Sequence, residues 1–553
     1  MRFSACLALS NGIGQLSPVA SRRVGWLGSS DMPGLWHSGR PPPAARAAGR
    51  RGTLGIEGGR MAYDPRHVAT LLGVPILRPA LLFPMLLPVL VAAYVRAAEL
   101  PELGDRSSAH VSTTVERQLA EVALKQIRAS LDTIADPILK YYVHVNIHRL
   151  AEHSDWNEPN LVTVLVDNPQ INAFAVPGGI VGVNLGLLLY AEDESEYSAV
   201  IAHELAHLGQ RHYARSLEEQ RAMTPWMLAG VIASLAIAAA GGSSDAGMAT
   251  MYGTQALAED RALRFSRTRE QEADRIGLNT LAQAGLDPHG VARMFVRMQT
   301  AFRFVDKPPE FLLTHPLTES RITDARNQAQ RFEVREVAPS LDYQCMRARA
   351  QVHYAESAGR ALAEAKDRRG SGHADADVYA YALALARDRQ HDQAVEVMRP
   401  LHDKHPTSLI MTASFAEVLI GASRLDEALA LLAHQLRINP DNEPLTYFYA
   451  EALNAAERHA EAADVLWRHI RVNDNDIDVW ELLAETAGLA GDTVGVHRAR
   501  AEYFARIGAY RQAIQHVDYA RRLVDEGERQ LMARLDQRIL DLRTEFEAIR
   551  TQN

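Results

Sequence analysis

The sequence predicts a mainly α-helical protein with two folded domains, the first containing a small β-sheet and the second forming an α-solenoid. Apolar residues recur at helical spacing over residues 107–149, and short β-branched runs follow between residues 160 and 183. Beyond residue 390 the chain repeats with a period of 34 residues. A chain of 553 residues is too long for one hydrophobic core, which also favours two domains.

The composition is typical of soluble globular proteins. Hydrophobic residues make up 47% and charged residues 23%, and the net charge of -9 is mild for this length. There is no basic stripe in the sequence, so we expect no nucleic-acid partner. The two cysteines, Cys6 and Cys345, lack the spacing of metal ligands, so any metal site must use histidines and carboxylates.

The N-terminal part has two segments that are not expected to belong to a folded domain. Residues 1–60 are rich in arginine and poor in acidic residues, so we expect disorder, either in a transit peptide or in sequence upstream of a true start at Met61. Residues 61–97 resemble a signal peptide, because basic residues precede an apolar run of 14 residues at 80–93. We therefore expect export, which in a bacterium leads to the periplasm. An uncleaved anchor or an internal hydrophobic helix is the alternative.

A small sheet and a histidine-bearing helix are expected next. Apolar runs at 160–166, 171–176 and 180–183 are separated by turn-forming residues and predict three strands. A helix should begin near Asp193 and run to about His212.

This helix contains the stretch His203-Glu204-Leu205-Ala206-His207. Residues four apart share one face of a helix, so His203 and His207 can bind one metal ion, and Glu204 can take a proton from an activated water. The five-residue pattern alone also occurs by chance in unrelated helices.

A second helix, at residues 266–275, offers a third ligand. A catalytic zinc needs three protein ligands and one open position. Glu270 can complete a site of two histidines and one glutamate, and Asp274, one turn later, can orient a ligand histidine. An exposed helix with ion pairs between its turns is the alternative. An apolar run at 227–240 is too short to cross a bilayer, and we expect a core helix, a membrane-surface helix or a lid there.

The C-terminal period indicates tetratricopeptide repeats. It is carried by three alanines and three residues at helix boundaries, which are Ala394, Ala428, Ala462, Pro406, Pro440 and Asp474. The register is expected to drift past residue 490. Stacked repeats form a curved surface that binds extended peptides or partner proteins, although a purely structural solenoid is the alternative.

Several motifs together resemble the M48 family of metallopeptidases. They are the His203–His207 stretch, Glu270-Gln271-Glu272-Ala273-Asp274, His315-Pro316-Leu317-Thr318-Glu319-Ser320-Arg321-Ile322, and Asn172-Ala173-Phe174-Ala175 followed by Pro177-Gly178-Gly179. The domain order is similar to that of exported bacterial members that carry tetratricopeptide repeats and serve the assembly of outer-membrane β-barrels. The resemblance covers residues 107–545.

The resemblance implies a helical zincin-type metallopeptidase domain that holds one zinc ion (Zn2+) per chain. His203, His207 and Glu270 would be the zinc ligands, and Glu204 would be the general base. In the family the ligand is the first glutamate of the Glu-x-x-Ala-Asp motif, which selects Glu270 over Glu272.

The resemblance also assigns roles to the loop and the strand. His315 matches a loop histidine that can occupy the open position of the zinc and keep the enzyme latent, or can bind the oxyanion in the active state. Arg321 is a second candidate for the oxyanion role, unless it braces the loop. The strand of Asn172, Ala173, Phe174 and Ala175 resembles an edge that receives substrate as an added β-strand.

The resemblance implies a zinc-dependent endopeptidase of the cell envelope that degrades misassembled outer-membrane proteins and assists their assembly. We expect a metallopeptidase domain at 98–340 and a repeat domain at 345–553 that docks on the outer-membrane protein assembly machinery. Peripheral contact with the outer membrane is a further expectation. One alternative is a chaperone-like repeat scaffold whose metal site is plugged by His315. Another is an integral-membrane peptidase anchored by the two apolar runs.

Overall fold

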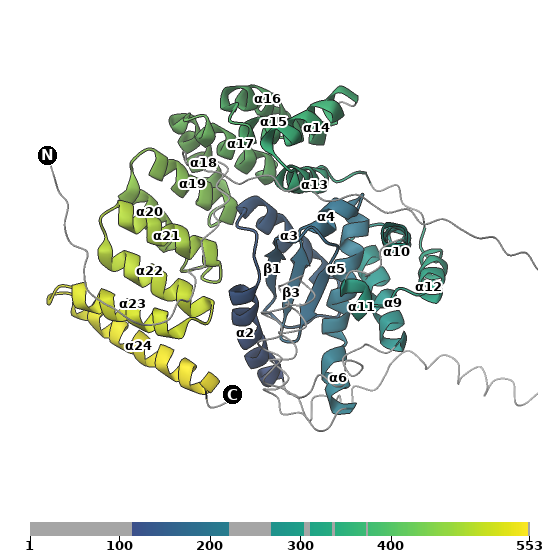
Figure 1. Ribbon diagram of the computed structural model, residues 1–553, viewed down its shortest axis with the longest axis horizontal. Coiled ribbons are helices and arrows are strands. Elements are labelled where there is room, and N and C mark those ends of the chain that lie inside the picture. The colour runs from purple at the N-terminus through teal and green to yellow at the C-terminus, as the bar shows by residue number, and fades with distance from the viewer. Residues whose placement is uncertain (1–112, 220–266, 304–309, 334–337, 372–373, 551–553) are drawn as a thin grey trace, which may run out of the picture. The chain divides into compact units, whose positions relative to one another are not determined.

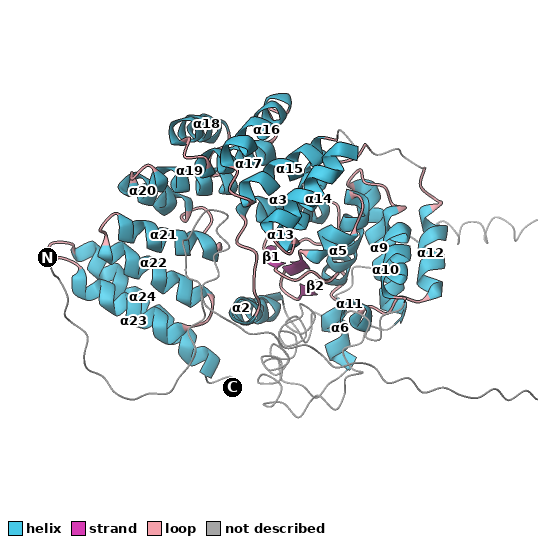
Figure 2. Cartoon of the chain, turned by 45° about the horizontal axis from the view of Figure 1, so that its top comes forward, coloured by secondary structure: helices cyan, strands magenta, loops and turns pink. Residues whose placement is uncertain are grey.

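The computed structural model describes residues 113–219, 267–303, 310–333, 338–371 and 374–550. The expected N-terminal extension, the signal peptide and the apolar run at 227–240 lie outside these residues. Helices make up most of the described chain, and strands form one small sheet (Figure 2). The predicted mainly α-helical class is therefore confirmed.

No helix among the described residues has the length and apolar character needed to cross a membrane.

The sheet has three strands in the order β1-β3-β2. β3 (Ile180–Asn184) pairs in parallel with β1 (Val162–Val166) and antiparallel with β2 (Ala173–Val176). The turn between β2 and β3 contains Gly178 and Gly179, whose φ values of 87° and 96° suit glycine because it lacks a Cβ atom. Among the described residues β2 pairs with β3 alone, so it is an edge strand.

The helical stretch expected at 107–149 is two helices, α2 (Thr113–Ser130) and α3 (Pro137–Ala151). Asp136 caps α3, because its carboxylate accepts hydrogen bonds from two backbone N–H groups of the first turn. Pro137 occupies the first helical position, where a missing N–H group costs nothing. The first helix therefore ends at Ser130, and Asp136 starts the second.

The histidine-bearing helix is α5 (Glu194–Gly209), and it begins at the predicted cap, Asp193. Its end differs from the prediction. The helix stops at Gly209 rather than His212, and Arg211 takes a left-handed conformation with φ of 48°. A separate helix, α6 (His212–Glu219), starts there. The other described helices before residue 340 are α4 (Gly186–Tyr190), α9 (Arg267–Gln283), α10 (Gly290–Phe302), α11 (Glu310–Thr314) and α12 (Glu319–Ala329).

The remaining helices stack in pairs (Figure 1). They are α13 (Leu341–Tyr354), α14 (Ala358–Ser371), α15 (Asp375–Arg387), α16 (His391–Lys404), α17 (Leu409–Gly421), α18 (Leu425–Ile438), α19 (Glu443–Ala455), α20 (His459–His469), α21 (Ile477–Leu489), α22 (Thr493–Arg506), α23 (Tyr510–Leu523) and α24 (Arg529–Arg550). The three repeat alanines are fully buried between these helices, as close helix packing requires.

The 34-residue period continues further than predicted. α16, α18, α20 and α22 begin 34 residues apart, so the register holds past residue 490 and shifts only at α23. The turn before each of these four helices contains a left-handed residue, namely Arg389, Ser423, Glu457 and Gly491. A tight turn between antiparallel helices imposes this conformation, which glycine adopts most easily and other residues adopt at a cost.

A buried arginine joins the first part of the chain to the repeats. Arg349 on α13 is 1% exposed and contacts the carboxylates of Asp136 and Glu417, the latter at 2.8 and 2.9 Å. Lys140 on α3 makes a second connection, because its ammonium lies 2.5 Å from the carboxylate of Asp476 on the repeat side. A buried cation between two carboxylates stabilises the fold only while all three groups are present.

We therefore expect Arg349→Met to lower the free energy of unfolding by about 3–5 kcal/mol, because two carboxylates lose their buried counter-ion. Urea unfolding followed by circular dichroism measures this change. The matched control is Arg360→Met, which removes an exposed ion pair with Glu364 and should cost no more than about 0.5 kcal/mol. Equal effects of the two substitutions would contradict the stabilising role of Arg349.

Candidate metal centre

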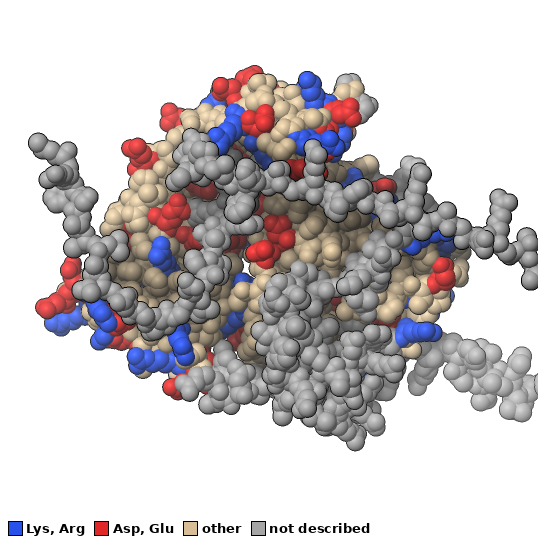
Figure 3. Space-filling view, in the orientation of Figure 1, with Lys and Arg blue, Asp and Glu red and all other residues tan. Residues whose placement is uncertain are grey.

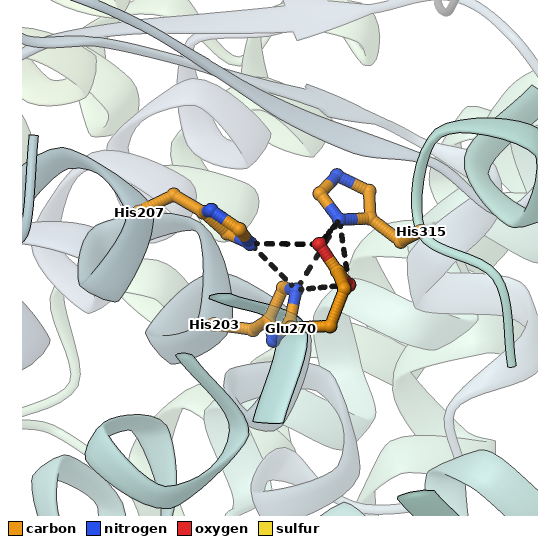
Figure 4. Close-up of side chains that lie close together, drawn as sticks. All are labelled: His203, His207, Glu270 and His315. Carbon is orange, nitrogen blue, oxygen red and sulfur yellow. Dashed lines mark hydrogen bonds and ion pairs between the residues drawn. The ribbon is translucent and has the colours of Figure 1, made fainter. Parts of the chain in front are cut away.

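Four side chains that can bind a metal converge at the centre of the first folded region (Figure 4). His203 and His207 come from successive turns of α5, Glu270 comes from α9, and His315 directly follows α11. All four residues are at most 5% exposed. Helices α5 and α9 approach each other closely at Gly277 of α9, where an added Cβ atom would lie 3.3 Å from the backbone of α5.

The distances between the four side chains fit one tetrahedral metal ion. The ligand atoms are Nε2 of His203 and His207, Nδ1 of His315 and the carboxylate of Glu270, and five of the distances between them fall between 3.1 and 3.5 Å. Metal–ligand bonds of about 2.0–2.1 Å in a tetrahedron place ligands about 3.3–3.4 Å apart. The donor set of imidazoles and a carboxylate suits a divalent transition metal.

Glu204 lies beside this cluster and is 1% exposed. Its Oε1 atom lies 3.5 Å from Nε2 of His315, and its carboxylate accepts a hydrogen bond from the backbone N–H of Ala175 on β2. Burial raises the pKa of the Glu204 carboxyl, although nearby histidines oppose the shift. The carboxylate is therefore a stronger base than an exposed glutamate, and it connects the cluster to the edge strand.

A buried ion pair contacts the Nδ1 side of His203, opposite the Nε2 atom that faces the cluster. Nδ1 of His203 lies 2.9 Å from Oδ1 of Asp274, and the guanidinium of Arg321 donates two hydrogen bonds of 2.7 and 2.8 Å to the same carboxylate. Burial lowers the pKa of His203, but contacts with Asp274 and Glu270 outweigh it and raise that pKa to about 9. Asp274 thus makes the contact expected of a residue that orients His203, and its role stays a prediction.

Arg321 also contacts the loop that carries His315. Its Nη1 atom lies 2.9 Å from the carboxylate of Glu270 and donates a hydrogen bond of 3.0 Å to the carbonyl of Pro316. These contacts are those of a brace, one of the two roles that the sequence left open. The oxyanion role of Arg321 stays a prediction.

The residues predicted to receive substrate lie on and next to the edge strand β2. Ala173, Phe174 and Ala175 belong to the edge strand β2, and Asn172 immediately precedes it. Phe174 lies across Gly182 of β3, where an added Cβ atom would lie 2.1 Å from the Phe174 ring. The glycine therefore makes room for the ring, which packs with residues of α2 such as Leu119 and Ala123.

Two residues near the cluster were not predicted to act in the site. Nδ1 of His212 lies 2.9 Å from Nδ1 of His207, and Nε2 of His212 lies 3.3 Å from the carboxylate of Glu272. The sequence predicts His212 at the end of a continuous helix, and the family motif selects Glu270 rather than Glu272 as the metal ligand. Gly209, the last residue of α5, is a local signal for the break at Arg211 that brings His212 to His207.

Comparison with known proteins supports the resemblance to the M48 family independently of the site geometry. Residues 137–329 match peptidase family M48, and residues 419–486 match the tetratricopeptide repeat. The β-barrel assembly-enhancing protease of Yersinia pestis is 33% identical over 447 residues, which cover 80% of this chain and 91% of that relative. The protein of the same name from Escherichia coli (strain K12) is 32% identical over 452 residues, covering 81% and 92%.

A second group of relatives matches a smaller part of the chain. The mitochondrial metalloendopeptidase OMA1 of Schizosaccharomyces pombe is 30% identical over 215 residues, which cover 38% of this chain and 60% of that relative. The family resemblance predicted from the motifs is confirmed. With a His and Glu cluster that can bind a metal and repeats that follow it, the chain belongs to the M48 family of metallopeptidases.

Proposed function

We propose that this protein is a zinc-dependent endopeptidase of the cell envelope. The observation that carries the proposal is the convergence of His203, His207 and Glu270, with the buried carboxylate of Glu204 beside them. Two histidines and one glutamate are a ligand set typical of catalytic zinc. Family membership does not favour the alternative of a chaperone-like scaffold.

The reaction proposed is hydrolysis of internal peptide bonds. Zinc at this site would polarise the scissile carbonyl and make a water molecule more acidic. Glu204 takes the proton of that water on its carboxylate and later donates it to the leaving amine. Asp274 and Arg321 keep the ring of His203 in place, and the edge strand β2 holds the substrate as an added strand.

The geometry of His315 supports a latent resting state. Its Nδ1 atom lies 3.3 Å from Nε2 of His203 and 3.1 Å from the carboxylate of Glu270, within the distances expected of a fourth ligand. A fourth protein ligand would fill the position that water needs for catalysis. Activation would then require His315 to leave, after which it could stabilise the oxyanion.

The substrate class follows from the relatives and the repeats. Proteins named β-barrel assembly-enhancing proteases cover nearly the same length, so misassembled outer-membrane proteins are the proposed substrates. The repeat domain, proposed at 345–553, would dock the peptidase domain, proposed at 98–340, on the assembly machinery in the periplasm. On the face shown in Figure 3 the acidic and basic side chains of the described residues are interspersed, so we expect shape to guide docking more than net charge.

Metal content tests the ligand assignment. We expect one zinc per purified wild-type chain and loss of zinc in Glu270→Ala, because two histidines alone form an incomplete site. Inductively coupled plasma mass spectrometry after dialysis measures the ratio, with the exposed Glu356→Ala as the matched control. Unchanged zinc in Glu270→Ala would show that the ligand assignment is wrong.

Glu204→Gln tests the proposed general base. The substitution keeps the size of the side chain and the zinc ligands but removes the base, so kcat should fall by about 10²–10⁴-fold while zinc content stays the same. Cleavage of an unfolded outer-membrane protein, followed by gel electrophoresis, measures the rate. If Glu204→Gln cleaves as fast as wild type, the protease activity does not come from this site.

His315→Ala distinguishes the latent state from the oxyanion role. If a plugged state holds about nine-tenths of the molecules, its release should raise kcat about tenfold. A fall in kcat of about 10²–10³-fold would instead identify His315 as an oxyanion ligand. The control is His289→Ala, which removes a histidine that pairs with Asp287 in the turn before α10 and should leave kcat unchanged.

A further inference from the structure

The ring of His207 has a partner on the side that faces away from the metal cluster. Its Nδ1 atom lies 2.9 Å from Nδ1 of His212, and the ring planes meet at 74°. On the other side of His212, Nε2 lies 3.3 Å from Oε2 of Glu272. Both histidines are at most 1% exposed, whereas the Glu272 side chain is 39% exposed. A row of three polar groups therefore runs from the metal cluster to the surface.

The contact between the two histidines depends on the break between α5 and α6. On a continuous α-helix, residues five apart point about 140° away from each other, so His212 could not face His207. Arg211 makes the contact possible through its left-handed conformation, and its guanidinium is fixed by hydrogen bonds of 3.1 and 3.2 Å to Glu116. Unfavourable backbone conformations that the surrounding structure holds in place are common at functional sites.

The hydrogen-bond pattern of this row follows from the need for a metal ligand. Nε2 of His207 must present a free lone pair to bind a metal, so the ring proton sits on Nδ1. That proton is donated to Nδ1 of His212, which must then carry its own proton on Nε2. The Nε2–H group of His212 is in turn donated to the carboxylate of Glu272.

We propose that His212 and Glu272 are positioning residues that lock His207 in the orientation and tautomer that bind the metal. The inference deepens the proposed zinc site and rests on it. The unusual feature is the intermediate imidazole, because a ligand histidine commonly bonds directly to a carboxylate or a backbone carbonyl.

The two ligand histidines are supported differently. His203 faces Asp274, a buried carboxylate that Arg321 neutralises. The support of His207 ends at Glu272, which is partly exposed and lies 3.9 Å from Arg215. A partly exposed carboxylate is screened by solvent, so removing Glu272 should weaken the support less than removing His212 does.

The row of His207, His212 and Glu272 is called the relay below. Four substitutions in the full-length chain separate the contributions of its parts. His212→Leu removes the acceptor for His207 and should weaken zinc binding about 10–100-fold. His212→Asn should stay within about threefold of wild type, because its amide oxygen lies near the position of the lost Nδ1 atom and can accept the same proton. Glu272→Ala should weaken binding by less than His212→Leu, and Glu272→Gln, which keeps an acceptor, should weaken it least.

Zinc affinity is measured by competition with a chromophoric chelator. The Nδ1–H proton of His207 is followed by nuclear magnetic resonance in the zinc-loaded chain. In wild type and His212→Asn this proton should be hydrogen-bonded and resonate far downfield. In His212→Leu the signal should move upfield or be lost to exchange with water. The control His289→Leu removes a histidine–carboxylate pair elsewhere and should change neither readout.

The outcomes distinguish the relay from the zinc site itself. If wild type binds zinc and His212→Leu binds it equally well, the relay is wrong and the zinc site stands. If wild type binds no zinc, the proposed function fails and the relay fails with it. If His212→Leu does not fold, failure of His212→Asn to retain affinity together with full affinity in Glu272→Ala would overturn the proposal.

Discussion

Burial of three carboxylates in one small volume is the constraint on which this site depends. Glu204, Glu270 and Asp274 are each at most 5% exposed, and carboxylates removed from water are unstable unless positive charge lies close to them. Arg321 supplies one cation and contacts two of the three. The remaining negative charge makes the position between the histidines attractive for a divalent cation.

The same constraint links the loop of His315 to the helices. Arg321 bonds the carboxylates on α9 and the carbonyl of Pro316 at once, so the loop cannot shift far without disturbing the pair with Asp274. Asp274 in turn faces His203 on α5. If His315 fills the metal position at rest, as proposed, these contacts of Arg321 favour a local rotation of His315 over displacement of the whole loop.

The sequence predicted the elements that obey local rules. His203 and His207 follow from helical spacing, the cap at Asp193 from its carboxylate, and the repeats from their 34-residue period. The repeat register past residue 490 was underestimated, because Val496 replaces the recurring alanine while the helix boundaries stay in phase. The recurring alanines show where two helices pack closely. The 34-residue period is kept by the turns between the helices.

Other features could not be predicted, because they depend on contacts between distant residues. Gly209 ends α5, but the left-handed conformation of Arg211 that follows is held by Glu116, which lies 95 residues earlier. Without that break, His212 is an ordinary residue on the wrong face of a helix. The burial of Arg349 is equally hidden, since arginine is rarely buried and its two carboxylate partners lie far away in the sequence.

The position of Arg349 bears on how this protein could be divided into separate recombinant pieces. Its helix, α13, begins at Leu341, directly after the proposed peptidase domain, yet Tyr343 on it bonds the carbonyl of Ala191 and Arg349 itself reaches Asp136. A peptidase fragment that stops at residue 340 would expose the surface these side chains cover. A repeat fragment that starts at residue 345 would begin inside a helix. Each piece needs α13, because this helix packs against both domains and is not a linker between them.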